Sequence, residues 1–336
     1  MTMYKVGSLF AGIGGICKAF KDAGCEVVWA NEYDKNACKT YRANFQHTLI
    51  EDDIHNTNPE ELEDVDILTS GFPCQAFSIA GYRKGFTDER GDLFFETMRF
   101  IDAIKPKAFF LENVRNLISH DSGNTFKVIK EFIEESGYSL EWNILDSMEY
   151  GNIPQTRKRI YMIGFRDEGN MPKMNPRRIC SNNFKFPEPI NLAKTIDDLL
   201  EKGQVNEKYY YTQASKYHDM FKEHITKRNT IYQLRRIYVR ENKSSVCPTL
   251  TANMGMGGHN VPLIQDDYGI RKLTPRECAR FQGIPDDFIL PDDVANSHLY
   301  QQMGNSVVVP VVQRIAENII SALDAKYFNS KIAVNA

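Results

Sequence analysis

The chain has 336 residues, of which 42% are hydrophobic and 25% charged, and its formal net charge at pH 7 is −3. This length and composition predict a soluble globular protein with one large domain and one smaller domain. No apolar run approaches the roughly 18 residues of a membrane span, and the first residues carry no signal-peptide pattern, so we expect a cytoplasmic protein without membrane attachment.

The seven cysteines are scattered along the chain without a C-x-x-C pair. An odd number without such pairs argues against a disulfide framework and against a zinc site, so we expect a reducing compartment and no metal ion. The weak overall charge leaves nucleic-acid binding open, because a basic footprint can be local. Two basic runs, at 155–159 and 227–240, are candidates, although most charge runs are solvated faces.

The first 165 residues or so alternate short apolar strands with helical patterns. We expect strands at 5–10, 27–32, 65–70 and 108–113, helices at 15–24, 35–44, 93–104 and 125–136, and a hairpin-like pair over 140–164. Strands that alternate with helices in this way predict an α/β fold with a doubly wound, mostly parallel sheet.

The composition and the periodicity of the sequence change near residue 171. A segment with four prolines, 171–189, is typical of a linker, and 190–270 is less periodic, which suggests a small, irregular, β-rich module. Helical patterns return at 274–283, where Thr274 is the expected N-cap, and at 308–327. We therefore expect a large domain over 1–185, completed by a helix within 300–330, and a small domain with its hinge over 186–299.

The glycine-rich stretch 8–15, SLFAGIGG, lies between a predicted strand and a predicted helix, where it can hold a polar group at the helix N-terminus. The dinucleotide fingerprint that begins at Gly12 is broken by Cys17 at its sixth position. Glu32 ends the second strand and can accept hydrogen bonds from a ribose, while Asp53 can accept one from an adenine amino group. An adenosyl ligand without a pyrophosphate, such as S-adenosylmethionine, suits this set.

Cys74, in the stretch GFPCQAFS, follows a buried strand and is a candidate nucleophile at the carboxyl end of the sheet. An unpaired cysteine is more often a small buried apolar residue, so the residue type alone does not decide. Glu112, Arg157 and Arg159 also fall at strand ends. A thiolate, a carboxyl group and guanidinium donors are what nucleophilic addition to an electron-poor heterocycle requires.

Taken in order, the motifs resemble those of the DNA (cytosine-5) methyltransferases of the bacterial restriction-modification type. They are FAGIGG, NEYDKNA, DDI, GFPCQAFS, GFTDERGDLFFE, ENV, QTRKRIYMIG, LTPRECARFQGIP and QMGNSVVVPV, and they run along nearly the whole chain. The resemblance implies a site-specific enzyme, from a bacterium or a phage, that transfers a methyl group to C5 of a flipped-out cytosine in double-stranded DNA. It also implies S-adenosylmethionine as the methyl donor and S-adenosylhomocysteine as the product.

The same resemblance assigns catalytic roles to four residues. Cys74 would attack C6 of the cytosine as a thiolate, and Glu112 would bind N3 and the amino group. Arg159 would hold the O2 atom, and Arg157 would support the cysteine region.

Cofactor and DNA contacts carry over in the same way. The resemblance implies that Phe10 stacks on adenine. It implies that the remaining cofactor contacts come from Gly12, Gly14, Glu32, Asp53, Leu93 and Asn305. It also implies that the DNA is contacted by Gln75, Ser78, Arg235, Arg236, Thr251, Asn253 and His259. The variable segment 186–270 would contain the target-recognition region. Its basic run would supply phosphate contacts.

Two alternatives from other classes remain. A transfer-RNA cytosine methyltransferase would share the chemistry, and a DNA-binding protein without turnover would share the fold. The long variable region disfavours the first, and the presence of Cys74, Glu112 and Arg159 disfavours the second. We expect a monomer; a cognate restriction endonuclease, where one exists, would act separately, and the recognition sequence does not follow from the residues.

Overall fold

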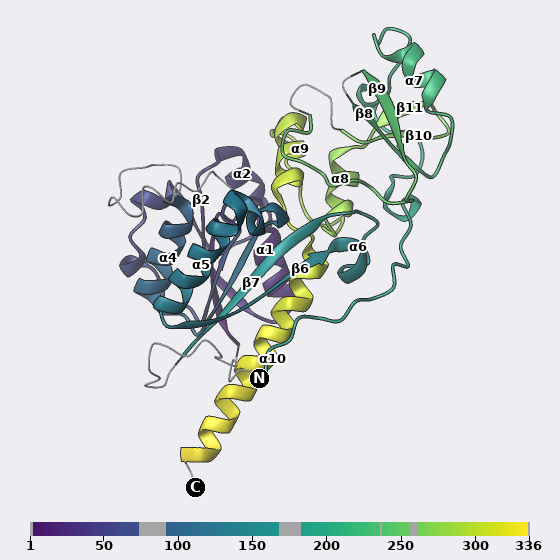
Figure 1. Ribbon diagram of the computed structural model, residues 1–336. Helices are drawn as coiled ribbons and strands as arrows, with labels where there is room; N and C mark the ends of the chain where they lie inside the picture. The colour runs from purple at the N-terminus through teal and green to yellow at the C-terminus, as the bar shows by residue number, and fades with distance from the viewer. Residues whose placement is uncertain (1–2, 74–91, 168–182, 236, 256–260, 335–336) are drawn as a thin grey trace.

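The computed structural model describes residues 3–73, 92–167, 183–235, 237–255 and 261–334 (Figure 1). Five of the residues singled out above lie outside these ranges, namely Cys74, Gln75, Ser78, Arg236 and His259.

A seven-stranded sheet in the order β3-β2-β1-β4-β5-β7-β6 forms the centre of the large part of the molecule. Its strands are β1 (Lys5–Leu9), β2 (Glu26–Glu32), β3 (Thr48–Glu51), β4 (Ile67–Ser70), β5 (Ala108–Val114), β6 (Tyr138–Asp146) and β7 (Lys158–Arg166). The first five are parallel to one another, while β7 runs antiparallel to both β5 and β6. The predicted α/β fold with a mostly parallel sheet and a terminal hairpin is therefore confirmed.

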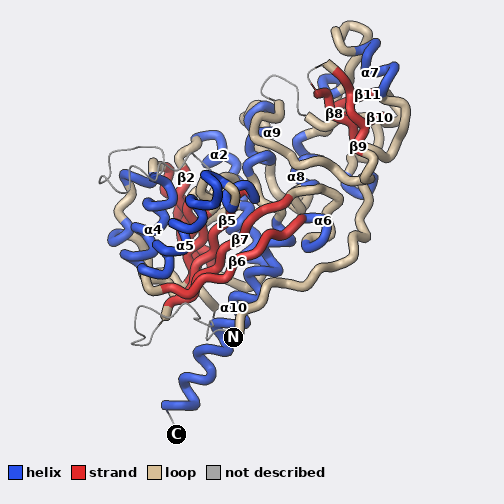
Figure 2. Tube along the Cα trace, viewed as in Figure 1, coloured by secondary structure: helices blue, strands red, loops and turns tan. Residues whose placement is uncertain are grey.

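Helices cover both faces of this sheet, and Figure 2 shows its red strands lying between blue helices. The helices α1 (Gly15–Asp22), α2 (Lys35–Asn44) and α10 (Val309–Val334) contribute to the core on one face, and α4 (Asp92–Ile104) and α5 (Asn124–Glu135) to the core on the other. Along β5, Phe110 joins the first core and Phe109 the second, because successive side chains of a strand point to opposite faces. Burial on both faces explains why the predicted strands are continuous apolar runs.

A second, antiparallel sheet forms the small module at the upper right of Figure 1. Its strand order is β11-β10-β8-β9, with β8 (Ile231–Arg235), β9 (Tyr238–Asn242), β10 (Leu263–Gln265) and β11 (Ile270–Lys272). The helix α7 (His218–His224) packs against it through Phe221, which shares a small core with Tyr232 and Leu234. The predicted β-rich module is therefore present, although the boundaries placed at 186 and 299 stay predictions.

Three further α-helices follow strands of the two sheets. They are α6 (Ser147–Tyr150), α8 (Pro275–Phe281) and α9 (Asn296–Asn305). Short 3₁₀ helices occupy Ile54–Asn56, Pro59–Glu61, Arg115–Ile118, His120–Gly123, Asp197–Leu199 and Glu207–Tyr209. Buried residues of α8 and α9, including Phe281 and Met303, belong to the same core as α1 and α10. The C-terminal part of the chain therefore joins the small module to the large sheet.

The helix α8 begins as predicted. Thr274 accepts a hydrogen bond from the Glu277 backbone N–H, and the Glu277 side chain accepts one from the Thr274 N–H, which makes a capping box with Pro275 in the first turn. Glu277 also forms a buried ion pair with Arg271 of β11 at 2.8 Å. This motif thus fastens the small module to the helical layer.

The segment Asn296–Lys326, which contains α9 and the described side chains of α10, is long and apolar enough to span a membrane by composition alone. However, 61% of its most apolar window is buried inside the protein. The segment packs against α1 and behaves as the core helix of a globular domain.

Candidate active site

A cavity of about 450 Å³ opens at the carboxyl ends of the central strands, where an α/β sheet is expected to bind its ligand. Its walls come from the residues that follow β1, β2, β4 and β5, from the start of β7, and from the end of α9. They include Phe10, Gly12, Glu32, Gly71, Pro73, Glu112, Arg157, Arg159 and Asn305. Most of the residues predicted for cofactor binding and for catalysis within the described ranges therefore line one cavity.

At one end of the cavity, the turn after β1 is held by Glu32. The Glu32 carboxylate accepts a hydrogen bond from the Gly12 N–H at 2.7 Å and two more from the N–H groups of Tyr33 and Asp34, at 3.0 and 2.8 Å. Burial raises the pKa of Glu32, and these three donors oppose the rise. The carboxylate is therefore fixed in place, while its remaining lone pairs can still accept bonds from a ligand.

The backbone of this turn requires unusual conformations. Phe10 has a φ of 51° and Gly12 a φ of 56°, both in the left-handed region, which is rare for a bulky residue such as Phe10. A Cβ atom added to Gly12 would meet no protein atom within 4 Å, because it would project into the open cavity. This is the geometry of a cradle that leaves room for a ligand close to the backbone.

Three of the predicted cofactor residues lie elsewhere. Gly14 caps α1 with a φ of 91°, and a Cβ there would lie 2.2 Å from Phe45, so close packing accounts for this glycine. Asp53 is half-exposed and caps a 3₁₀ helix by accepting a bond from the His55 N–H. Leu93 packs against the core under α4. None of the three is among the residues that line the described cavity, so their cofactor contacts stay predictions.

At the other end of the cavity, Glu112 and Arg159 form an ion pair, with Arg159 Nε 3.1 Å from Glu112 Oε1. The register of β5 and β7 places Val114 opposite Arg159, two residues along from Glu112, so both side chains lie at the same end of the sheet. Burial raises the pKa of the Glu112 carboxyl, and the charges of Arg159 and Arg157 oppose this rise. The pair can therefore present both a proton donor and a fixed cation to a bound ring.

Arg157 is buried and acts as a tie between distant segments. Its guanidinium donates to the carbonyl oxygens of Leu250, Gly304 and Ser306 at 2.8, 3.0 and 2.6 Å. Burial lowers its pKa, yet an arginine with these acceptors keeps its charge. Arg157 thus joins the start of β7, the segment around Leu250 and the end of α9.

Asn113, which the sequence motif ENV contains but to which we assigned no role, anchors the segment before Cys74. Its amide donates to the carbonyl oxygen of Phe72 at 2.9 Å, and its side-chain oxygen accepts from the Val114 N–H at 2.8 Å. Phe72 and Pro73 line the cavity, so this bond holds the backbone of Phe72 at the cavity wall. The sequence signal that could have identified Asn113 is its position: it is a polar residue in a buried strand, directly next to Glu112.

Five of the seven cysteines lie within the described ranges, and all five are buried without a disulfide partner. Burial raises the pKa of Cys25 and of Cys38 to about 12 and also raises those of Cys17, Cys247 and Cys278. A reactive thiolate needs the opposite shift, so none of these five is suited to nucleophilic attack.

The helix α9 contributes polar side chains that the sequence did not single out. His298 and Gln302 line the cavity, and within the described part of the chain His298 Nδ1 and Gln302 Nε2 are buried without a hydrogen-bond partner. Tyr33, next to Glu32, also lines the cavity and is 69% exposed. The same cavity is lined by Asp34 and Ala37 at the start of α2. No periodicity distinguishes His298 and Gln302 from ordinary helix-surface residues.

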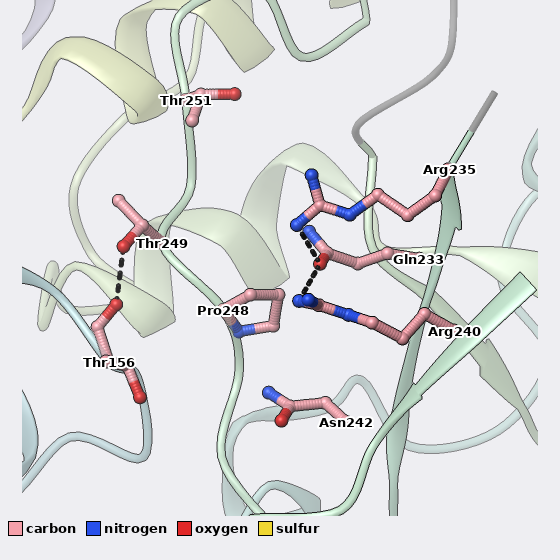
Figure 3. A pocket seen from close by; sticks show the side chains of 8 residues that line it. All are labelled: Thr156, Gln233, Arg235, Arg240, Asn242, Pro248, Thr249 and Thr251. Atoms are coloured by element: carbon pink, nitrogen blue, oxygen red, sulfur yellow. Dashed lines mark hydrogen bonds between the residues drawn. The ribbon is translucent and has the colours of Figure 1, made fainter.

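The residues predicted to contact DNA and described by the structure lie around a second hollow, of about 390 Å³, between the small module and the large sheet (Figure 3). Arg235 and Thr251 line it, and Asn253 accepts a hydrogen bond from the Thr251 hydroxyl at 2.6 Å. A Cβ at Gly304 would lie 2.2 Å from the Thr251 backbone, so this segment packs directly on α9. Within the described ranges, no cluster of His, Cys, Asp and Glu has the geometry of a metal site.

Comparison with known proteins agrees with this geometry. The family model described as C-5 cytosine-specific DNA methylase matches residues 4–321. The chain is 55% identical to Type II methyltransferase M.Bsp6I of Bacillus sp. (strain RFL6), over 96% of this chain and 100% of that protein. It is 40% identical to Type II methyltransferase M.HhaI of Haemophilus parahaemolyticus, over 95% and 94% of the two chains.

Solved structures share the fold. The crystal structure of S. pombe Dnmt2 methyltransferase superposes with a TM-score of 0.71 at 20% identity, over 96% of this chain and 99% of that one. A putative DNA modification methyltransferase encoded within an E. coli prophage gives 0.67 at 24% identity, over 96% and 99%. The family match and the close relatives carry the assignment: the chain belongs to the C-5 cytosine-specific DNA methylase family, as a DNA (cytosine-5)-methyltransferase of the bacterial restriction-modification type.

Proposed function

We propose that this enzyme methylates C5 of a cytosine in one short sequence of double-stranded DNA, and that Cys74 forms a covalent bond to C6 of a base rotated out of the duplex. The observation that carries the proposal is that one cavity contains the Glu32 and Gly12 cradle at one end and the Glu112 and Arg159 pair at the other. A base inside a duplex cannot reach such an enclosed pair, so the base has to leave the stack.

The chemistry of the ring follows from these side chains. Addition of the Cys74 thiolate to C6 pushes an electron pair into the ring, and protonation at N3 accepts that charge. The raised pKa of Glu112 suits it to hold a proton at N3, and Arg159 suits the O2 atom as a fixed hydrogen-bond donor. C5 thereby becomes the nucleophile that takes the methyl group. Loss of the C5 proton and departure of the thiolate then restore the aromatic ring.

S-adenosylmethionine would supply an electrophilic methyl group. The fit is supported by the open space at Gly12 and by the fixed carboxylate of Glu32, which can accept bonds from ribose hydroxyls. Phe10 can offer a ring face to adenine, and Asn305, exposed at the end of α9, can hydrogen-bond to the methionine part. Gln302 of α9 lines the cavity and its Nε2 atom has no hydrogen-bond partner among the described residues, which supports a role as a further polar contact to the cofactor.

The test is base-resolved sequencing of unmethylated plasmid DNA after incubation with the protein and S-adenosylmethionine. We expect 5-methylcytosine in one short context with the wild-type chain and none with Cys74→Ser, while Cys74→Ser still binds DNA. Cys247→Ser is a matched control, because Cys247 is a buried thiol outside the cavity, and it should leave the methylated context unchanged. Normal methylation by Cys74→Ser would exclude the covalent route, and labelling of RNA alone would exclude the DNA substrate.

A further inference from the structure

The side chain of Gln233 holds two arginines side by side on the small module. Arg235 Nη2 and Arg240 Nη2 each donate to Gln233 Oε1 at 2.9 Å, and Figure 3 shows the two guanidinium groups meeting at this one oxygen from opposite sides. Gln233 is 5% exposed, so its position is set by packing. The two arginines are thus fixed relative to each other by a buried acceptor.

The pairing of β8 with β9 explains how three residues from two strands come together. Gln233 lies directly opposite Arg240, and Arg235 lies two residues along β8, on the same face. On the other face, Tyr232 and Leu234 pack into the small core with Phe221. One face of this two-stranded ribbon is therefore anchored, and the other presents guanidinium groups.

Stability does not account for this arrangement. Two guanidinium cations on one oxygen repel each other. In the described part of the chain, neither Arg235 nor Arg240 forms an ion pair with a carboxylate, whereas the nearby cations Lys227 and Arg228 are paired with Glu241 and Asp267. The repulsion would be relieved by a ligand rich in acceptors.

The hollow in front of the pair adjoins the catalytic cavity. Its far wall is formed by Thr156, Thr249 and Thr251, and Thr249 donates to the Thr156 carbonyl at 2.6 Å. Thr156 directly precedes Arg157, whose guanidinium lines the catalytic cavity and binds the carbonyl of Leu250. The two hollows are therefore lined by neighbouring residues of one segment, Thr156 and Arg157.

We propose that the β8–β9 ribbon enters the major groove and that Arg235 and Arg240 each read a guanine through its O6 and N7 atoms, with Gln233 as the residue that positions both. This inference rests on the proposed function and specifies its target: the recognition sequence contains guanines in addition to the partner of the methylated cytosine. A two-stranded ribbon fits the major groove, and bidentate arginine to guanine is the commonest specific contact there. Donating one N–H to Gln233 leaves each arginine with enough donors for a bidentate contact.

The experiment is the methylation of a plasmid library with randomised sequence, followed by base-resolved sequencing, at several salt concentrations. Arg235→Lys and Arg240→Lys keep the charge but lose the planar fork. Each should lower the preference for guanine at one position of the recognition sequence by about 10- to 100-fold and leave the other positions unchanged. Gln233→Met, which keeps the size but removes the acceptor, should relax both positions together.

Arg228→Lys is the matched control, because Arg228 lies on the same module but faces Asp267 and a different hollow. It should leave the recognition sequence unaltered. The proposal is overturned if the lysine variants change the rate equally in every sequence context at each salt concentration, because phosphate contacts do not distinguish sequences. It is also overturned if the wild-type context holds no further guanine. A wild-type protein that methylates no cytosine contradicts the proposed function itself, a result distinct from both.

Discussion

Glu112 and Arg159 meet across two neighbouring antiparallel strands, with Arg159 Nε 3.1 Å from Glu112 Oε1. The contact depends on β7 running antiparallel to β5, because this brings the start of β7 to the carboxyl end of the parallel strands. A carboxyl group with a raised pKa therefore lies beside a fixed cation at the carboxyl end of the parallel strands.

Glu112→Gln should lower the rate of methyl transfer by about 10²- to 10⁴-fold, because the amide keeps the shape of the carboxyl but cannot give a proton to the ring. Single-turnover methylation of a cognate duplex measures this, with cofactor affinity followed separately and expected to stay within about twofold of wild type. Glu141→Gln on the edge strand β6 makes the same change of charge outside the cavity and should leave the rate unchanged. A rate for Glu112→Gln close to wild type would remove Glu112 from the chemistry.

Arg159→Gln should move the alkaline limb of the pH–rate profile to higher pH. Burial raises the pKa of Glu112 and the Arg159 charge lowers it, so removing that charge lets the protonated carboxyl persist further. The position of this limb is measured from the residual single-turnover rate of the variant as a function of pH. Arg159→Lys keeps the cation, so its limb should stay near that of wild type even where its rate falls.

The same shift has a consequence for stability. A carboxyl whose pKa is higher in the folded than in the unfolded state favours folding at low pH. This contribution is lost as the pH rises from the ordinary glutamate value, 4.5, through the raised one. Arg159→Gln should therefore steepen the loss of stability with rising pH, as measured by urea unfolding at a series of pH values. A flat difference from wild type across that range would contradict the assignment.

Gly12→Ala should weaken S-adenosylmethionine binding by at least about tenfold, because its new methyl group would occupy the cradle beside Glu32. The left-handed backbone at φ 56° adds a folding cost of about 1 to 2 kcal/mol. Gly24→Ala separates the two effects: Gly24 also has a positive φ, 96°, and open space, but it lies outside the cavity. Calorimetric titration should show a loss of affinity for Gly12→Ala only, and equal losses in both variants would contradict the cradle.

Glu277→Ala should destabilise the fold by about 3 to 5 kcal/mol, because it removes the capping side chain of α8 and leaves the buried Arg271 with Asp266 as its remaining carboxylate partner. Arg271 and Glu277 are 1% and 0% exposed as side chains, and Glu277 also accepts the backbone N–H groups of Thr274 and Glu201. Thermal and urea unfolding measure the loss. The surface pair of Lys39 and Asp293 serves as a control, and Lys39→Ala should leave the midpoint almost unchanged. A comparable midpoint for both variants would show that the α8 motif does not fasten the small module.

Local signals in the amino-acid sequence are sufficient to predict several elements of the fold. The alternation of apolar strands and helices predicted the sheet, since burial on both faces leaves continuous apolar runs. Thr274 and Pro275 marked the start of α8, because a cap acts within one turn. The order of motifs likewise identified the family, and Gly12, Glu32, Glu112 and Arg159 proved to line one cavity.

Contacts between segments far apart in the chain follow only from the way the elements pack together. Nothing near Arg157 in sequence indicates that it binds the carbonyls of Leu250, Gly304 and Ser306, and Gly14 is explained by Phe45 rather than by the cavity. The contact of Arg235 and Arg240 with Gln233 depends on the register of β8 and β9, since a shift of one residue would turn the two arginines to opposite faces. Local patterns report the period of an element, whereas register and packing depend on which elements meet, and that is set by the whole chain.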